Sequence, residues 1–340
     1  MNELEALRWR TEQYRGRLCQ QVDRLYNALE ELSRTSLLLL GLPHDDGDID
    51  AWLQDERFAV DDDGFFQSAT ALEAFRRGAL GDDAFSVSWG RHLVDHTLAR
   101  RHLYGHRDLG AHLRSLHRRL GDVGWIYYQD ACNVSLQYPF IDQRTAITAD
   151  FDWTQYHTFR SVAPDTNPER EIRWTPPSVD YAGEGIILSV SIPIWRDDVF
   201  IGLWSIDLPI RYLCQDFTAS SLPRQTQFIC DRDGLLVSHD RLQAEIDQSQ
   251  GRLFLHSVKE LGGQWEDIDV ARDLVSEVDG ELSVEQAEGE RWVYTYCLVP
   301  GVDWLVFSGI PQVAMEEAAA MRLKEAFRRV SDGNFRYRIE

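Results

Sequence analysis

The sequence predicts an α+β protein in which a long helix precedes two antiparallel sheets with flanking helices. Three observations support this prediction. Apolar residues recur every seven positions through the first forty residues, the pattern changes from helical to strand-like at residue 123, and the strand order that follows recurs before residue 311. A chain of 340 residues is long enough for two domains that each bury a core.

The first forty residues predict one long helix, which Gly41 and Pro43 end. Its heptad positions are Leu4, Thr11, Leu18, Leu25, Leu32 and Leu39, with Leu7, Tyr14 and Ala28 each three residues further on. Such a seam serves either to pair the helices of two chains or to pack the helix on the domains of its own chain. The sequence leaves both roles open.

Residues 49–121 predict mostly helical structure, and the stretch 91–119 within them is locally basic. It carries seven Arg and six His, including the pairs His92/His96 and His102/His106. Two His four residues apart on a helix can bind Zn²⁺ when a third ligand converges, but the neighbouring Arg side chains repel a cation. We expect a solvated or internally paired helix face and no metal.

From residue 123 the pattern predicts strands. Residues 123–129 form a compact apolar run followed by a turn, and residues 139–182 are irregular. Residues 186–195 and 199–208 then predict an antiparallel hairpin joined by a short polar turn.

A second, shorter copy of this order follows. It comprises a strand, turn and strand in residues 227–238, a polar segment with helical character to about residue 279, and strands at 281–286, 292–299 and 304–310. An internal repeat of this kind indicates two domains built on one plan. We place a long helix, which the seam suits to dimerisation, in residues 1–42, a first domain in 43–215, a second domain in 216–312 and a C-terminal segment in 313–340.

Charge and motif content narrow the function. The formal net charge of −21 argues against nucleic acid as a partner, because a duplex-binding surface needs clustered Lys and Arg. The sequence has no G-x-S-x-G, HExxH, P-loop or spaced Cys/His set. We therefore predict that this region is not an enzyme and needs no cofactor.

Residues 174–208 carry a series of motifs in a fixed order. They are WTPP at 174–177, GEG at 183–185, a strand at 187–194 that contains Pro193, and GLWSID at 202–207. This series resembles the first domain of tandem (double) Cache sensors, which belong to bacterial histidine kinases, diguanylate cyclases and chemoreceptors. The second half agrees, with DRDG at 231–234, His239, and a final strand that ends at Pro311. The resemblance implies a long N-terminal helix followed by two PAS-like antiparallel-sheet Cache domains, the first binding a small molecule and the second transmitting.

The resemblance also implies a ligand site. It assigns ligand-binding roles to Asp207, Trp174, Trp153 and Tyr156. The family's Arg before its Trp-Tyr pair is absent here, and Arg144 or Arg173 can replace it, since a guanidinium matches a carboxylate from any direction.

The residues themselves add two candidates and an alternative. Ser189 can donate from the adjacent strand, and Tyr181 can wall the cavity. In the alternative, Asp207 caps the helix that follows and the tryptophans pack the core. The ligand is an amino acid, an amine or an organic acid.

The chain's last thirty residues predict a signalling connector. Residues 313–329 form a charged helix where a membrane span is usual in the family, and residues 330–339 resemble a HAMP-type linker. We expect a cytoplasmic, homodimeric receptor that senses a small molecule and signals to a C-terminal output domain. The alternatives are an extracytoplasmic sensor without its membrane helices, and a ligand-free dimerisation scaffold.

Overall fold

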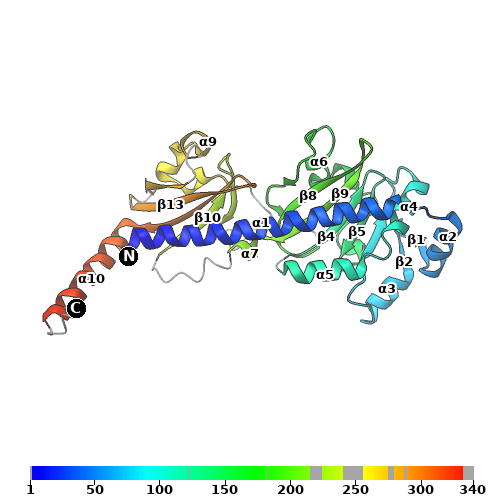
Figure 1. Ribbon diagram of the computed structural model, residues 1–340, viewed down its shortest axis with the longest axis horizontal. Coiled ribbons are helices and arrows are strands. Elements are labelled where there is room, and N and C mark those ends of the chain that lie inside the picture. Colours follow the sequence, from blue (N-terminus) through cyan, green and yellow to red (C-terminus); the bar gives the residue numbers. More distant parts are fainter. Residues whose placement is uncertain are drawn as a thin grey trace, which may run out of the picture. The chain divides into compact units, whose positions relative to one another are not determined.

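The computed structural model describes residues 2–121, 123–180, 182–214, 224–239, 256–274, 279–286 and 289–331. The chain divides into two compact units, each with one antiparallel sheet (Figure 1). Unit 1 comprises Met1–Val22 and Leu213–Glu340, and unit 2 comprises Asp23–Tyr212. Helix α1 (Glu3–Gly41) matches the predicted long helix and contributes its first part to unit 1 and the rest to unit 2.

Unit 2 contains the sheet with the most strands. Its order is β1-β2-β3-β5-β4-β9-β8-β6, with β7 also pairing with β8. The strands are β1 (Phe58–Val60), β2 (Phe66–Ser68), β3 (Ser86–Trp89), β4 (Ile126–Asp130), β5 (Val134–Tyr138), β6 (Arg173–Trp174), β7 (Ser178–Val179), β8 (Ile186–Arg196) and β9 (Val199–Pro209). The predicted hairpin is confirmed as β8 and β9. Its turn residues Asp197 and Asp198 both have positive φ, as a two-residue type I′ turn requires.

Helices surround this sheet. They are α2 (Asp46–Asp55), α3 (Ala69–Arg76), α4 (His96–Gly105), α5 (Gly110–Leu120) and α6 (His157–Val162), with the short 3₁₀ helices η1 (Gln143–Thr145) and η2 (Trp153–Gln155). Helix α7 (Ile210–Cys214) follows β9. The prediction of a mostly helical segment at 49–121 missed β1, β2 and β3, because strands of three or four residues are too short to establish a period.

Unit 1 repeats the central part of the same sheet. Its strands are β10 (Thr226–Cys230), β11 (Leu236–His239), β12 (Asp279–Glu285), β13 (Arg291–Val299) and β14 (Trp304–Pro311), in the order β11-β10-β14-β13-β12. The order β5-β4-β9-β8-β6 of unit 2 is equivalent strand by strand. The predicted repeat of two PAS-like antiparallel sheets is therefore confirmed, and the fold is α+β.

The core of unit 1 lies between its sheet and short helices. Phe228, Trp265, Tyr294 and Phe307 pack together there, and each is at most 2% exposed. The short helices are η4 (Val258–Leu261), η5 (Gly263–Asp267) and α9 (Val270–Asp273), and the longer helix α10 (Gln312–Ser331) follows β14. The HAMP-like residues beyond Ser331 lie outside the described part of the chain.

The heptad seam of α1 is buried within its own chain. Leu7, Leu18, Leu25 and Leu32 are each at most 3% exposed. In unit 1, the Thr11 hydroxyl lies 2.7 Å from that of Thr295 on β13. The seam therefore packs intramolecularly, which is one of the two roles that the sequence left open. The homodimer stays a prediction and loses the seam as its basis.

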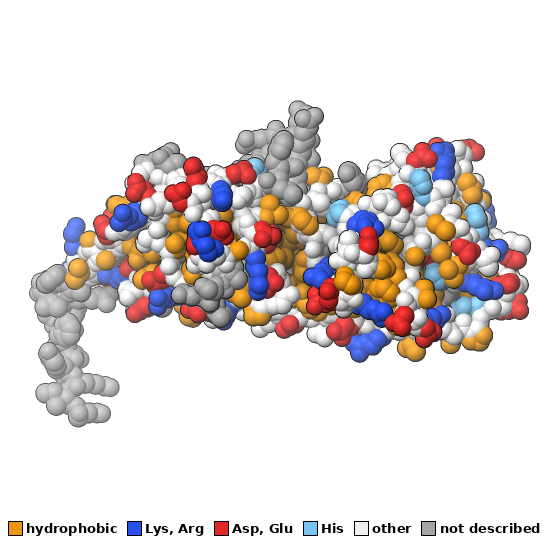
Figure 2. Space-filling view, turned by 90° about the horizontal axis from the view of Figure 1, so that it is seen from above, with side chains coloured by type: hydrophobic (Ala, Val, Ile, Leu, Met, Phe, Trp, Pro, Cys, Tyr) orange, Lys and Arg blue, Asp and Glu red, His pale blue; other side chains and the backbone are white. Residues whose placement is uncertain are grey.

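The basic stretch 91–119 forms internal ion pairs. Its seven Arg pair with acids as Arg91–Asp150, Arg100–Asp50, Arg101–Asp46, Arg107–Asp108, Arg114–Asp82, Arg118–Asp82 and Arg119–Glu31. Figure 2 accordingly shows acidic and basic side chains interspersed over the face that it presents. The expectation of an internally paired surface is confirmed for these arginines. Within the described residues, no helix is both long and apolar enough to cross a membrane.

Candidate functional site

One face of the unit 2 sheet is unusually polar. Side chains two residues apart on a strand share a face, so four neighbouring strands bring a polar set together. The set is Ser135 and Gln137 on β5, Tyr127 and Gln129 on β4, Ser205 and Asp207 on β9, and Ser189 and Ser191 on β8. All eight are buried. Because a buried polar group costs free energy unless it has a partner, this face is not an ordinary core.

The segment that contains η1 and η2, together with Trp125 and the turn after β7, contributes the other walls of a cavity on this face, which we name the Asp207 cavity. Its lining is Trp125, Tyr127, Gln129, Ser135, Gln137, Gln143, Ala146, Ile147, Phe151, Trp153, Tyr156, Asp180, Ala182 and Asp207. It leaves about 50 Å³ for the centre of a water-sized sphere. Since one water needs roughly 10–15 Å³ by this measure, the cavity has room for a few waters or one small ligand.

Asp207 is the central acid of the cavity. It is 4% exposed, and its Oδ1 accepts hydrogen bonds from Ser189 Oγ at 2.6 Å and Tyr127 OH at 3.0 Å. Burial raises the pKa of Asp207 to about 7; the Ser189 hydroxyl opposes that rise and the nearby Asp180 carboxylate adds to it. A cation in the cavity would favour the charged form of Asp207.

Asp180 is a second acid of the lining and is held in a fixed position. Its carboxylate accepts from Trp125 Nε1 at 3.0 Å and from the backbone N–H groups of Ala182 and Glu184. The donors hold the side chain against the turn that follows β7. The cavity thus contains two carboxylates, one of them almost completely removed from water.

Two other polar groups of the lining have no partner among the described residues. They are Gln129 Nε2 and Ser135 Oγ, both fully buried. The Gln129 amide is held at its other end, where Oε1 accepts from Thr158 Oγ1 at 3.4 Å. A buried donor without an acceptor costs about 1–3 kcal/mol. These two groups therefore indicate that the occupied cavity contains a further hydrogen-bonding group.

Aromatic rings form much of the wall. Trp153 lies edge-on to Phe151 and to Tyr156, with ring centroids 4.7 Å and 6.2 Å away. Asn133 positions this part of the wall, because its Oδ1 accepts from the Trp153 backbone N–H at 2.9 Å. Asn133 has φ 74°, a conformation that Asn adopts more readily than most residues. Aromatic faces next to carboxylates favour organic cations.

The predicted site residues divide into two groups. Asp207, Trp153 and Tyr156 line the cavity, and Ser189 supports Asp207 from β8. The Asp207 carboxylate is bonded to side chains of the neighbouring strands, Tyr127 on β4 and Ser189 on β8. Its backbone N–H donates to the carbonyl oxygen of Trp125.

The other predicted residues lie away from this lining. Trp174 Nε1 donates to Tyr26 OH on α1 at 3.0 Å. Arg173 pairs with Glu171, and Arg144 pairs with Asp142 at 2.6 Å. Tyr181 lies outside the described residues. No Arg, Lys or His occurs in the lining as far as the structure describes it.

The sequence prediction missed Tyr127, Gln129, Ser135 and Asp180. The signal was present in residues 125–129, where Trp, Tyr and Gln alternate with apolar or aromatic residues of the other face. An alternation with a period of two residues predicts a strand with one polar face. Which residue of β5 lies opposite Gln129 depends on strand register, which no local pattern specifies.

A second network occupies the opposite face of the same sheet. Trp204 Nε1 on β9 donates to Ser36 Oγ on α1 at 2.7 Å, and Ser36 Oγ lies 2.9 Å from His106 Nε2. His106 Nδ1 lies 2.7 Å from the carbonyl oxygen of His102, which can only accept. Nδ1 therefore carries the proton and Nε2 accepts from Ser36. Burial lowers the pKa of His106 to about 4, which keeps the ring neutral.

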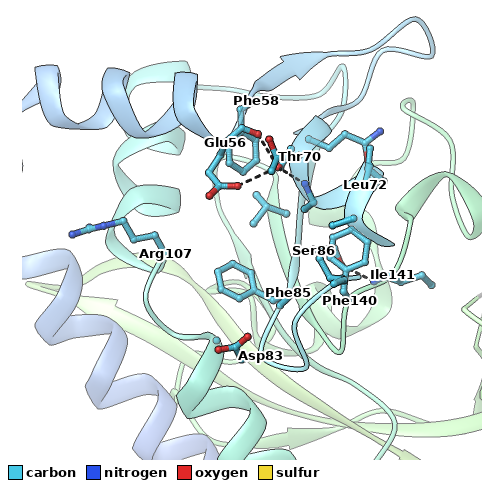
Figure 3. A pocket seen from close by; sticks show the side chains of 18 of the residues that line it. Glu56, Phe58, Thr70, Leu72, Asp83, Phe85, Ser86, Arg107, Phe140 and Ile141 are labelled. Atoms are coloured by element: carbon cyan, nitrogen blue, oxygen red, sulfur yellow. Dashed lines mark hydrogen bonds between the residues drawn. The ribbon is translucent and has the colours of Figure 1, made fainter. Parts of the chain in front are cut away.

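A larger cavity, the Phe85 cavity, also lies in unit 2 (Figure 3). It leaves about 460 Å³ for the centre of a water-sized sphere. Arg107 is the cation of its lining, but its guanidinium lies 3.7 Å from the centre of the Tyr104 ring and points away from the other labelled side chains in Figure 3. Within the described residues, no lining side chain of this cavity has a buried polar atom without a partner. We therefore place the candidate site in the Asp207 cavity.

Comparisons with known proteins give weak matches in structure. No family model matches the chain, and no curated protein matches it in sequence. The ligand-binding domain of the Pseudomonas aeruginosa PAO1 amino acid chemoreceptor PctB, in complex with L-Gln, is 14% identical with a TM-score of 0.46, covering 89% of this chain and 98% of that one.

Two further solved structures are similar at the same level. The ligand-binding domain of Mlp24 with asparagine is 14% identical with a TM-score of 0.39, covering 89% of this chain and 98% of that one. The ligand-binding domain of the Pseudomonas fluorescens chemoreceptor CtaA, in complex with L-serine, is 18% identical with a TM-score of 0.42, covering 59% of this chain and 75% of that one. The fold itself rests on the strand order: one long helix and two equivalent PAS-like sheets, the arrangement that the resemblance to tandem Cache sensors implies.

Proposed function

We propose that this chain is the small-molecule-sensing input module of a bacterial signal-transduction protein, and that the Asp207 cavity binds a small organic cation. One observation carries the proposal: a carboxylate 4% exposed lies in an aromatic cavity that contains a second carboxylate and, in its described lining, no cationic side chain. A buried acid of this kind is expensive to ionise unless a cation joins it. The ligand supplies that cation.

The charges of the cavity favour one of the three candidate ligand classes over the others. An organic acid would bring a third negative charge next to Asp207 and Asp180. An amino acid offers an ammonium group but also needs a partner for its carboxylate, and the pairs that Arg144 and Arg173 make lie outside the cavity lining. A small amine satisfies Asp207 without that requirement. The amine is therefore the class that the charges favour.

Strand β9 offers a route from the cavity to the signalling helix. Asp207 lies on the cavity face of β9, and Trp204 lies on the opposite face, where it bonds to Ser36 of α1. A ligand that moves Asp207 acts on the strand that holds this part of α1. Ligand occupancy would then bias the position of the helix.

Thermal denaturation with chosen probes tests the ligand class. We expect ethanolamine and n-propylamine to raise the Tm of the wild type, and acetate to leave it unchanged. A ligand at about 100 times its Kd adds about 2.7 kcal/mol. The variant Asp207→Asn should lose the amine response, while Asp198→Asn, on a hairpin turn where the carboxyl is 86% exposed, should keep it. A protein that none of the probes stabilises would favour the ligand-free scaffold, and a response to acetate alone would favour an organic acid.

The remaining parts of the proposal concern the whole receptor. The homodimer, the C-terminal output domain and the cytoplasmic location are predictions from the sequence. Cell fractionation of the full-length protein tests the location, and recovery with the membrane or periplasm would support the extracytoplasmic alternative. The predicted boundary at residue 43 is tested by expressing residues 43–215 and residues 23–215 separately, with folding followed by circular dichroism; folding of the longer piece alone would move the boundary into α1.

A further inference from the structure

The donor pair Gln129 and Ser135 gives the Asp207 cavity a second recognition element. The two residues lie directly opposite each other on β4 and β5, so their side chains leave the same face of the sheet. Gln129 Nε2 and Ser135 Oγ are both fully buried in the lining, and neither has a partner among the described residues. The pair is separate from Asp207, whose hydrogen bonds run to Ser189 and Tyr127.

The chemistry of the pair calls for an acceptor. An amide nitrogen donates only, and the Thr158 hydroxyl holds the Gln129 oxygen, which leaves Nε2 as the end without a partner. The Ser135 hydroxyl can rotate to donate to the same atom. One oxygen atom between the two would satisfy both buried groups.

The charges in the cavity determine whether that acceptor is ionised or neutral. A carboxylate at this position would be buried without a counter-charge, because no Arg, Lys or His belongs to the described lining. It would also share the cavity with Asp180 and Asp207. A hydroxyl, carbonyl or carboxamide oxygen meets the same donors without that cost.

We infer that the Asp207 cavity is specific for a small ammonium compound that also carries an uncharged oxygen acceptor, which Gln129 and Ser135 bind. The inference rests on the proposed function, because the ammonium end is the group that Asp207 attracts. The small volume of the cavity limits the ligand to a compact amino alcohol or amino amide.

Isothermal titration with four probes tests the inference on the unmodified chain. Ethanolamine and n-propylamine have nearly the same size and charge, and differ by a hydroxyl in place of a methyl group. Glycinamide and glycine differ by an uncharged amide in place of a carboxylate. We expect ethanolamine and glycinamide to bind about tenfold more tightly than n-propylamine and glycine, since one such hydrogen-bond mismatch is worth roughly five- to a hundredfold.

Variants assign the effect to the donor pair. Gln129→Met keeps the side chain's length and removes its donor, and Ser135→Ala is the milder change. Each should weaken ethanolamine about tenfold and leave n-propylamine within twofold. Gln155→Met is the matched control, because Gln155 is exposed and outside the lining. Ser135→Ala keeps the test valid if Gln129→Met fails to fold.

The outcomes separate the two levels of the claim. Equal binding of ethanolamine and n-propylamine by the wild type, or an equal loss of both in the variants, overturns the acceptor inference and leaves the amine site standing. Preferred binding of glycine overturns the uncharged acceptor. Binding of no amine at all overturns the proposed function together with this inference.

Discussion

Replacing Asp207 by Asn should make the protein more stable at high pH and unresponsive to amines. The size of this change in the free energy of unfolding follows from the burial of the Asp207 carboxyl. Burial raises the pKa of Asp207 from 3.8 to about 7, and each unit of pKa corresponds to 1.36 kcal/mol. Ionised Asp207 therefore lowers the free energy of unfolding by at most about 4 kcal/mol. Asn keeps an oxygen that can accept from Ser189 and Tyr127 but has no charge to bury.

The direction of the pKa shift of Asp207 determines whether its contribution to stability rises or falls with pH. Between pH 3.8 and 7 native Asp207 holds a proton that the unfolded state has released, so the contribution of Asp207 to the stability of the wild type falls as pH rises through this window. Below the window both states are protonated, and above it both are ionised with the full cost present. We expect Asp207→Asn to gain about 1–3 kcal/mol over the wild type at pH 8 and close to nothing at pH 4.

Urea denaturation at pH 4, 5, 6, 7 and 8 measures this difference, on the transition that ethanolamine shifts in the wild type. His106 has a lowered pKa and adds its own slope, but it is present in both proteins and cancels in the comparison. Asp198→Asn should follow the wild type throughout. A variant that is less stable than the wild type at pH 8, or a difference that does not change with pH, would mean that Asp207 is a structural acceptor rather than a poised ligand-binding acid.

Three further predictions test the packing of helix α1 and of the network on the opposite face of the unit 2 sheet. Ser36→Ala leaves Trp204 Nε1 without its acceptor and His106 Nε2 without its donor, so it should destabilise unit 2 by about 1–3 kcal/mol in urea denaturation, while Ser33→Ala on the same helix should cost under about 0.5 kcal/mol. His106 is buried with a pKa of about 4, so its contribution to stability should rise from pH 4 to 6.5 and oppose the fall that Asp207 causes; over that range the wild type should therefore gain about 2–3 kcal/mol relative to His106→Gln, which a pH series of thermal melts on both proteins would detect. Leu18→Ala should cost about 2–5 kcal/mol at any protein concentration, because the seam is buried within the chain; a cost that shrinks as the protein is diluted from 100 to 1 µM would instead indicate pairing between chains.

Local chemistry explains what the sequence could predict. The heptad seam specifies α1, and the two consecutive Asp residues between apolar runs specify the turn of the β8–β9 hairpin. The internal repeat follows from the order of such local signals, and it matches the equivalent strand orders of the two sheets. Asp207, Trp153 and Tyr156 were named from motifs, and the fold brings them into one cavity.

Register and side-chain competition explain what the sequence could not predict. Gln129 meets Ser135 only because β4 and β5 pair in one register, and that choice depends on the whole sheet. Arg144 and Arg173 were candidates for a carboxylate clamp, but acids close by in sequence, Asp142 and Glu171, pair with them. Trp174 belongs to a recognisable motif, yet its indole N–H bonds to Tyr26 of α1. A motif identifies a residue type, whereas its partner depends on tertiary packing.

The groups whose burial lowers the stability of unit 2 without a ligand are also the groups that a ligand would contact. The ionised Asp207 lowers the stability of unit 2 by at most about 4 kcal/mol, against a total of about 5–15 kcal/mol for a typical domain, and Gln129 and Ser135 direct two further polar atoms at whatever occupies the cavity. A ligand that satisfies them removes this cost in the bound state alone. Since a ligand shifts a conformational equilibrium only by its difference in affinity for the two states, these three groups bound the size of the signal.

It follows that stability and response should separate in the variants. Asp207→Asn removes the largest cost from the empty state, so unit 2 should become more stable while its helix α1 no longer responds to amines. Hydrogen exchange at residues 30–41 of α1, measured with and without ethanolamine, reports this directly. Slower exchange on binding in the wild type, with exchange in the variant unaffected by ethanolamine, is the expected result. Ethanolamine-dependent protection that persists in the variant would place the sensing groups elsewhere in the cavity.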